Sequence, residues 1–260
     1  MAILTLTTDF GEGSHYVAQM KGAILSIDPG ATIVDITHGV PPQDVRAGGA
    51  VVAAAAVRFP SDAIHVVVVD PGVGSTRAIV YVEMEIGRFV LPDNGLLTSL
   101  ASGYPPLKIV AVENPEFWAS QVSRTFHGRD IMAPVAARLG LGLDPDQLGP
   151  RRSGLVQIEL REARRVGQTI EGEVVDVDSF GNLVTNITRE MLAAAPRDES
   201  LAIRCDGHET FGLYETYSDQ PEMTLLALIG SSDQLELAIV NDSAAAMLGV
   251  RAGAPVVVRW

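Results

Sequence analysis

Apolar residues follow two different spacings along the first 150 residues of the chain. Short apolar runs predict buried strands, and these are Ala2–Thr8, Thr32–Thr37, Ile64–Val69, Ile79–Glu85 and Arg88–Pro92. Between them apolar residues recur at helical spacing, which predicts helices over Tyr16–Ile27, Asp44–Phe59, Gly95–Ser102 and Ile131–Leu141. Because strands alternate with helices, we expect an α/β fold with a mostly parallel sheet and flanking helices.

The pattern changes after Leu143, where prolines and glycines lead into a charged stretch that ends at Arg165. Beyond it lie short alternating strands with turn residues between them: Thr169–Val177, Leu183–Ile187, Leu201–Arg204, Leu225–Ile229, Leu235–Val240 and Pro255–Trp260. We therefore predict an N-terminal α/β domain over residues 1–150, a linker over 151–165 and a smaller all-β domain over 166–260.

Composition narrows the class of protein. The chain has 260 residues, of which 47% are hydrophobic, so it can bury a sizeable core and is not disordered as a whole. A net charge of −13 argues against a nucleic-acid partner, because phosphate binding needs clustered Lys and Arg. The single cysteine, Cys205, fits a reducing compartment, and no apolar run reaches the ~18–20 residues that span a bilayer. We expect a soluble, cytoplasmic protein with no membrane partner.

One apolar strand ends in an acid. Val66–Val69 is followed by Asp70, and Arg77 comes seven positions later, across a loop that contains Gly72 and Gly74. In parallel α/β sheets, ligands bind at the carboxyl ends of the strands. The glycines could cradle a phosphate, but the Lys-Ser/Thr ending of a P-loop is absent. The acid and the guanidinium are therefore either an ion pair that closes the loop or part of a catalytic site.

Two further polar residues stand near predicted element ends. Asp9 follows the first strand, where a carboxylate commonly accepts both hydroxyls of a ribose; the alternative is a capping or turn aspartate. His127 precedes Gly128 and the last predicted helix of the first domain, in a loop position that suits acid–base or polarising chemistry. Its alternative is a hydrogen-bonded structural histidine. The histidines show no metal-ligand spacing, so we predict no metal site.

The second domain begins with a turn, Asp178-Ser179-Phe180-Gly181-Asn182. Glycine and asparagine are routine in hairpin turns, which is the structural interpretation. The same residues would also suit a ligand: Asp178 could bind an ammonium, Phe180 could stack on a flat ring and Asn182 could bond a purine edge or a carboxylate. Ser231 and Ser232 are likewise either a turn or a pair of hydroxyl donors.

Seven short motifs occur in a fixed order along the chain. They are Thr7-Thr8-Asp9-Phe10-Gly11, Ile36-Thr37-His38, Asp44-Val45-Arg46-Ala47-Gly48, Val69-Asp70-Pro71-Gly72-Val73-Gly74, Pro92-Asp93-Asn94-Gly95-Leu96-Leu97, Thr125-Phe126-His127-Gly128-Arg129-Asp130 and Asp178-Ser179-Phe180-Gly181-Asn182-Leu183-Val184-Thr185-Asn186-Ile187. Together they resemble the S-adenosyl-L-methionine (SAM) hydroxide adenosyltransferases, or SAM hydrolases, which are relatives of the fluorinase and chlorinase enzymes. The resemblance extends from about residue 3 to about residue 245.

The resemblance implies a fold, an assembly and a reaction. The expected fold is an α/β domain followed by a β-barrel-like domain, and the expected assembly is a homotrimer with SAM bound where domains of neighbouring subunits meet. Water would attack the ribose C5′ carbon in an SN2 step, giving adenosine and L-methionine. Because a sulfonium is already an activated leaving group, the reaction needs positioning and electrostatics, and we expect no cofactor or metal.

The resemblance also implies roles for individual residues. Asp70 would polarise the water, while Arg77 and His127 orient it and tune its charge. Halide-using relatives carry an aromatic hydroxyl in place of Asp70, and a carboxylate there would repel a halide ion. Among the binding residues, Asp9 matches the acid that holds the ribose hydroxyls. Asp178 matches the partner of the methionine ammonium, and Phe180 and Asn182 match contacts to the adenosine or the amino-acid part. Ser231 matches a serine that binds the methionine carboxylate in the halogenating relatives.

The chain departs from the family pattern at two positions. Ser232 stands where the halogenating relatives carry an arginine, and Gln43 stands where an aromatic residue often packs on the ligand. Two other functions remain as alternatives to SAM hydrolysis. One is transfer of a halide to the same carbon, and the other is non-catalytic binding of SAM or adenosine.

Overall fold

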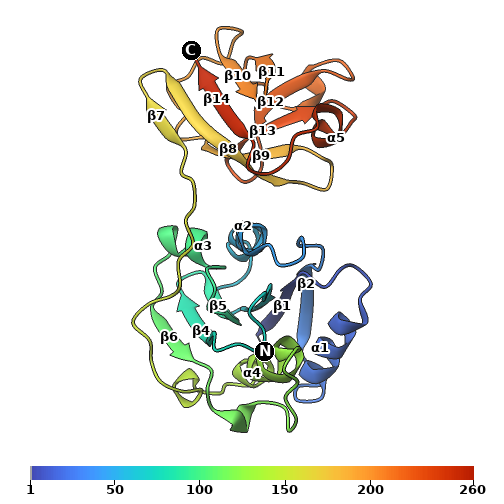
Figure 1. Ribbon diagram of the computed structural model, residues 1–260, viewed down its shortest axis with the longest axis vertical. Helices are drawn as coiled ribbons and strands as arrows, with labels where there is room; N and C mark the ends of the chain where they lie inside the picture. The colour runs from blue at the N-terminus through green and yellow to red at the C-terminus, as the bar shows by residue number, and fades with distance from the viewer. Residues whose placement is uncertain (1) are drawn as a thin grey trace. The chain divides into compact units, whose positions relative to one another are not determined.

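The computed structural model describes residues 2–260. They form two compact units, which divide between Glu159 and Leu160 (Figure 1). The division falls inside the stretch 151–165 that the sequence predicts as a linker. A short strand of the second unit, β7 (Arg164–Val166), begins within the same stretch.

The first unit is built on a mostly parallel sheet. Within residues 2–159 this sheet has six strands in the order β2-β1-β3-β5-β4-β6. Their bounds are β1 (Ile3–Thr8), β2 (Thr32–Thr37), β3 (Ile64–Val68), β4 (Ile79–Met84), β5 (Gly87–Pro92) and β6 (Lys108–Ala111). The pairs among β2, β1, β3 and β5 are parallel, and β4 is antiparallel to both β5 and β6. The predicted mostly parallel sheet is confirmed.

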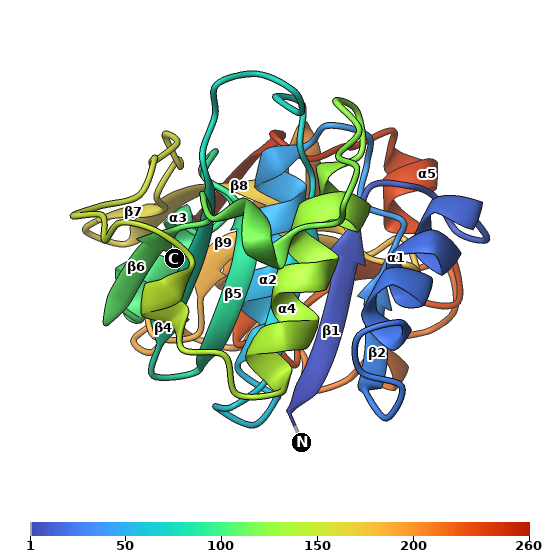
Figure 2. The ribbon, with the colours of Figure 1, turned by 90° about the horizontal axis from the view of Figure 1, so that it is seen from below.

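Helices cover both faces of this sheet. They are α1 (His15–Leu25), α2 (Val45–Ala56), α3 (Thr98–Gly103) and α4 (Ala133–Gly140). Figure 2 shows α4 in front of the strands and α2 behind them. In β3, Val66 packs into the core on the side of α1 and α4, whereas Val67 packs into the core on the side of α2 and α3. This double coverage explains why β3 is apolar at almost every position. None of the helices within residues 2–260 is long and apolar enough to cross a bilayer.

The second unit is an antiparallel, barrel-like sheet. Its order is β11-β10-β14-β8-β9-β13-β12, and β7 pairs with β8. The remaining bounds are β8 (Thr169–Val177), β9 (Leu183–Thr188), β10 (Ala202–Cys205), β11 (His208–Phe211), β12 (Leu225–Ile229), β13 (Gln234–Ile239) and β14 (Pro255–Arg259). The edge strands β11 and β12 approach each other, and Thr210 Oγ1 donates to the Leu225 carbonyl across 2.8 Å. The predicted all-β second part is confirmed.

Besides β7, one strand and one α-helix of this second unit were not predicted. β11 follows a turn at Asp206 and Gly207, both with positive φ, which is the two-residue hairpin turn expected for Asp-Gly. The helix α5 (Ala244–Leu248) is only five residues long; Ser243 caps its start and Gly249 ends it in the left-handed region. Both elements are too short to show a hydrophobic period.

Candidate active site

The chain reverses its direction of winding beside β1. The connection from β1 to β2 runs through α1 on one face, and the connection from β2 to β3 runs through α2 on the other, so β2 and β3 lie on opposite sides of β1. Such a reversal opens a crevice at the carboxyl ends of the two strands beside it. Thr8 of β1 lies opposite Val68 of β3. Asp9 and Asp70, which follow these strands, therefore stand at the same edge of the sheet.

Asp70, Arg77 and His127 form a continuous hydrogen-bonded set. Arg77 Nε donates to Asp70 Oδ1 at 2.9 Å, and Arg77 Nη2 donates to Asp70 Oδ2, making a two-pronged ion pair. The same Nη2 group lies 2.9 Å from His127 Nδ1. The side chains of Asp70 and Arg77 are 5% and 11% exposed. The structure thus brings together the three residues that the sequence proposes as catalytic.

The loop between Asp70 and Arg77 folds back on itself to make this contact. Ser75 Oγ donates to the Gly72 carbonyl at 2.6 Å and accepts from the Arg77 amide at 3.2 Å. Gly74 has φ +77°, and a Cβ on it would lie 2.4 Å from the Arg124 carbonyl oxygen. A glycine is therefore needed there both for the backbone conformation and for the close approach of the loop that leads to His127.

His127 opens a helix instead of lying in a loop. A π-helical turn, η2 (Gly128–Met132), follows it directly and runs into α4, so the helix starts earlier than the predicted Ile131. His127 itself has right-handed helical backbone angles and is half-buried, so the expectation that it lies in a loop is wrong. Gly128 allows this placement, because a Cβ there would lie 3.0 Å from Val68 of β3. π-Helical turns are frequent at functional sites.

The hydrogen bonds define the charge state of the set. A guanidinium only donates, so His127 Nδ1 must accept from Arg77, and the proton of the neutral ring sits on Nε2. Burial, and next the positive charge of Arg77, lower the pKa of His127 below its ordinary value. Asp70 is thus the only member of the set that offers an oxygen acceptor. Each of its oxygens accepts one bond from Arg77 and keeps a lone pair for another donor.

Asp9 belongs to a neighbouring network. Its Oδ2 atom accepts from the Gln43 amide at 2.8 Å, where Gln43 has a positive φ of 65°. The adjoining Phe10 ring packs edge-on against Phe126 at 5.5 Å between centroids, and Tyr16 packs on Phe126 at 5.2 Å. This aromatic contact joins the loop that carries Asp9 to the residue before His127. No hydrogen bond within the described residues joins Asp9 to Asp70 itself.

In the second unit, Asp178 and Asn182 contact each other. Asp178 Oδ1 accepts from the amides of Phe180 and Asn182, and Oδ2 accepts from the Asn182 side chain at 2.9 Å. These bonds form the tight turn that the sequence allowed as the structural interpretation. Phe180 is 78% exposed and Ser231 is also exposed. The ligand contacts predicted for these residues stay predictions.

Comparison with known proteins identifies the family. Residues 4–149 match the SAM hydroxide adenosyltransferase N-terminal domain, and residues 172–257 match the corresponding C-terminal domain. This chain belongs to the SAM hydroxide adenosyltransferase family. The chain is similar to the (R)-S-adenosyl-L-methionine hydrolase of Salinispora arenicola, with 36% identity over 253 residues, 96% of this chain and 95% of that protein. The predicted family resemblance is confirmed.

Two other proteins are also similar to this chain over nearly its full length. A crystal structure of an uncharacterized conserved protein from Thermotoga maritima matches with a TM-score of 0.95 and 35% identity, covering 99% of this chain and 100% of that one. A fluorinase from Nocardia brasiliensis is 29% identical over 289 residues, 99% of this chain and 96% of that protein. The chain is therefore more similar to the hydrolase than to this fluorinase over a similar length.

Asn94 supports the site, although the sequence analysis assigned it no role. It belongs to one of the seven motifs that resemble the family. Asn94 Nδ2 donates to the Val69 carbonyl at 2.9 Å, directly before Asp70. The amide orientation is fixed, because a carbonyl oxygen can only accept. Within residues 2–260, the Asn94 Oδ1 atom is buried without a hydrogen-bond partner. Asn94 thus fixes the backbone from which Asp70 projects.

In the second unit, Tyr217 and Glu236 are bonded residues to which the sequence analysis assigned no role. Tyr217 Oη donates to Glu236 Oε2 at 3.0 Å. Burial, and further the charge of Asp178, raise the pKa of Glu236, while burial and then Glu236 raise the pKa of Tyr217 to about 12. The sequence could not single out Glu236, because it alternates with Leu235 and Leu237 as an ordinary solvent-facing strand position would.

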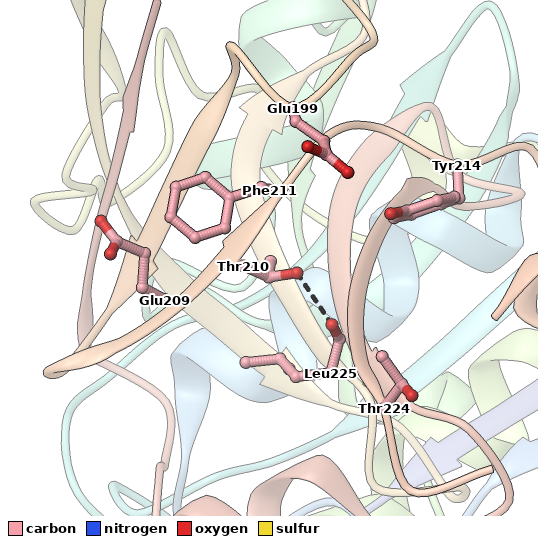
Figure 3. Close-up of a pocket in the computed structure, with 7 residues that line it drawn as sticks. All are labelled: Glu199, Glu209, Thr210, Phe211, Tyr214, Thr224 and Leu225. Carbon is pink, nitrogen blue, oxygen red and sulfur yellow. Dashed lines mark hydrogen bonds between the residues drawn. The ribbon is translucent and has the colours of Figure 1, made fainter. Parts of the chain in front are cut away.

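A separate cavity of about 590 Å³ lies beside the approach of β11 and β12. Figure 3 shows its lining residues, which are Glu199, Glu209, Thr210, Phe211, Tyr214, Thr224 and Leu225. It contains none of the residues that the sequence proposed. Within residues 2–260, no group of three or more His, Cys, Asp or Glu side chains is arranged to hold a metal ion.

Proposed function

We propose that this protein hydrolyses SAM to adenosine and L-methionine. The observation that carries the proposal is the bonded Asp70–Arg77–His127 set at the carboxyl edge of the parallel sheet, in a chain of this family. The set contains one carboxylate acceptor held in place by a guanidinium that also binds a neutral imidazole. It can hold and polarise a water molecule.

The reaction follows from the charges. The water oxygen forms a bond to the ribose C5′ carbon while the C5′–S bond breaks. The electron pair of the broken bond stays on sulfur and neutralises the sulfonium. One water O–H donates to Asp70 as the oxygen attacks, and the proton then passes to solvent. Arg77 fixes the direction of the Asp70 carboxylate, and His127, held neutral, adds no positive charge beside the cationic substrate. The protein's contribution is positioning and electrostatics.

The same geometry disfavours halide as the nucleophile. Arg77 offsets much of the Asp70 charge, but each carboxylate oxygen can only accept hydrogen bonds. A halide ion has no proton to donate to these oxygens, whereas a water molecule does. We therefore propose water, and not chloride or fluoride, as the group transferred.

The proposal includes substrate contacts and an assembly. Asp9 binds the ribose hydroxyls, Asp178 binds the methionine ammonium, and Phe180, Asn182 and Ser231 contact the rest of the ligand. The protein works as a cytoplasmic homotrimer, with each site completed by a neighbouring subunit. Sedimentation equilibrium is expected to give three times the chain mass of 27.6 kDa. A monomer that retains full activity would contradict this part of the proposal.

Chromatography of SAM incubated with the pure protein tests the reaction. The expected products are adenosine and L-methionine in equal amounts, formed after dialysis against EDTA because the proposal requires no metal or cofactor. Formation of S-adenosylhomocysteine, or of 5′-chloro-5′-deoxyadenosine in chloride buffer, would contradict it. SAM that binds and remains intact over hours would identify a binding protein instead.

A further inference from the structure

Glu236 is a buried acid on the outer face of the barrel-like sheet. Its neighbours Leu235 and Leu237 point into the barrel core, so Glu236 points the other way, on the same face as Leu228 of the adjacent strand. Outward positions of a strand are normally exposed, but Glu236 is only 7% exposed. Tyr217, from the short helical turn η4 (Tyr217–Asp219), donates its hydroxyl to the Glu236 carboxylate.

The β12–β13 turn is built around this carboxylate. A Cβ placed on Gly230 would lie 1.7 Å from Glu236 Oε1, so no residue other than glycine fits while the carboxylate stays there. Gly230 directly precedes Ser231, and its amide donates to the Gln234 carbonyl at 2.9 Å. The acid is thus held between Tyr217 and the turn that presents Ser231.

The described residues give Glu236 no positively charged partner. Among the described residues, no Lys, Arg or His forms an ion pair with Glu236 or with Asp178. Tyr217 supplies the one hydrogen bond that the described residues donate to the Glu236 carboxylate, and it goes to Oε2. Glu236 pairs with Val184 of β9, the strand that directly follows the Asp178–Asn182 turn, and the charge of Asp178 acts on the Glu236 carboxylate. Burying a carboxylate without a cation is costly, so this arrangement favours a positively charged ligand.

Asp178 alone cannot satisfy an ammonium. A carboxylate offers about four lone-pair sites, and the Asp178 turn already uses three of them. An ammonium has three N–H donors, so one remaining site leaves two donors unpaired. Glu236 Oε1 supplies further acceptor sites. Ca²⁺ or Mg²⁺ fits less well, because each needs six or more oxygen ligands.

We propose that Glu236, held by Tyr217 and acting together with Asp178, binds the α-ammonium group of the substrate's amino-acid part. This inference rests on the proposed SAM substrate and adds to it a second carboxylate that selects for the amine. Glu236 is a binding residue and takes no part in the reaction at the ribose carbon. Its loss should weaken binding while the chemical step proceeds.

Calorimetry on the full-length protein tests this assignment. L-Methionine is titrated in saturating adenosine, and so is 4-(methylsulfanyl)butanoate, which is methionine without its amine. We expect E236Q to weaken L-methionine at least 10-fold and to leave the amine-free analogue and adenosine unchanged. The matched control is E209Q, which removes an acid from an exposed strand position of the same unit. It should bind all three ligands as the wild type does.

The outcomes separate the two proposals. Equal L-methionine affinity in E236Q and the wild type overturns the role of Glu236, whatever the turnover of SAM. A wild type that binds L-methionine through Glu236 but leaves SAM intact overturns the proposed reaction alone. With active protein, E236Q should raise KM for SAM with little change in kcat. If E236Q does not fold, the L-methionine affinity of Y217F is measured instead. Unchanged affinity in that variant overturns the assignment of Glu236.

Discussion

At the scale of single residues, Asp70 is distinguished by its surroundings more than by its type. A two-pronged bond from Arg77 fixes its orientation, and Asn94 fixes the backbone carbonyl before it. The carboxylate therefore points in one direction before any ligand arrives. Such preorganisation is what lets a weak acceptor assist an attacking water.

Replacing Asp70 tests this role directly. D70N keeps the size of the side chain and removes the charge and one acceptor, so we expect kcat for adenosine formation to fall by about 10²- to 10⁴-fold, the range typical of a positioned proton acceptor. KM for SAM should change little. D62N, which alters an exposed loop acid, is the control. An activity of D70N within a factor of two of the wild type would exclude Asp70 as the water-polarising group.

The protonation of His127 is a second prediction at this scale. Because burial and Arg77 lower its pKa, His127 stays neutral above pH 6.5 and gains its proton only as the pH falls below that ordinary value. Imidazole ¹⁵N NMR should show Nε2 protonated and Nδ1 unprotonated at pH 7. A titration midpoint at or above 6.5, or a proton on Nδ1 at pH 7, would contradict the bond from Arg77.

At the scale of elements, the segments with a clear hydrophobic pattern could be predicted from the sequence, whereas several short segments could not. The strands β1 and β3 and the helices α1 and α2 show clear hydrophobic patterns. By contrast, β6 has four residues behind two prolines, which is too short for a period. The start of α4 was misplaced because the residues from Gly128 to Met132 form a π-helical turn, whose spacing differs from that of an α-helix.

Some residues of the candidate site could likewise be proposed from the sequence, and others could not. Asp70, Arg77 and His127 could be proposed because each belongs to a recognisable motif, and the structure joins them. Asn94 belongs to a motif without an obvious chemical role, and its function depends on a contact with a distant strand. Glu236 becomes distinctive only when Tyr217, which lies 19 positions away in the sequence, donates a hydrogen bond to it.

The loop from Asp70 to Arg77 gives a prediction at the element scale. G74A meets both a positive φ and the Arg124 carbonyl, so it should displace the loop and lower kcat more than 10-fold. G142A is the matched control, because Gly142 also has a positive φ but open space around it. That variant should lose about 1–2 kcal/mol of stability and keep its kcat. Steady-state kinetics and thermal melts of both variants distinguish these effects.

At the scale of the whole molecule, the two units carry different parts of the proposed function. The parallel sheet holds the residues proposed for the chemistry, and the barrel-like unit holds Asp178 and Glu236 for the amino-acid end of the ligand. The net charge of −13 suits a cationic substrate and helps to keep the protein soluble.

The stability of the whole protein should depend on pH through His65. Burial lowers the pKa of His65 to about 4, so the folded state binds fewer protons than the unfolded state between pH 6.5 and 4. The unfolding free energy should therefore fall as the pH drops through this window, by about 3 kcal/mol. Urea unfolding of the wild type and of H65N measures this. An equally steep fall in H65N would assign the dependence to other groups.

In the proposed reaction, a water molecule polarised by Asp70 attacks the ribose carbon of SAM. Incubation of SAM with the protein in ¹⁸O-labelled water, followed by mass spectrometry of the products, tests it most directly. We predict adenosine with one ¹⁸O atom at the 5′ position, together with unlabelled L-methionine. Intact SAM, or adenosine without the label, would exclude attack by water at this carbon.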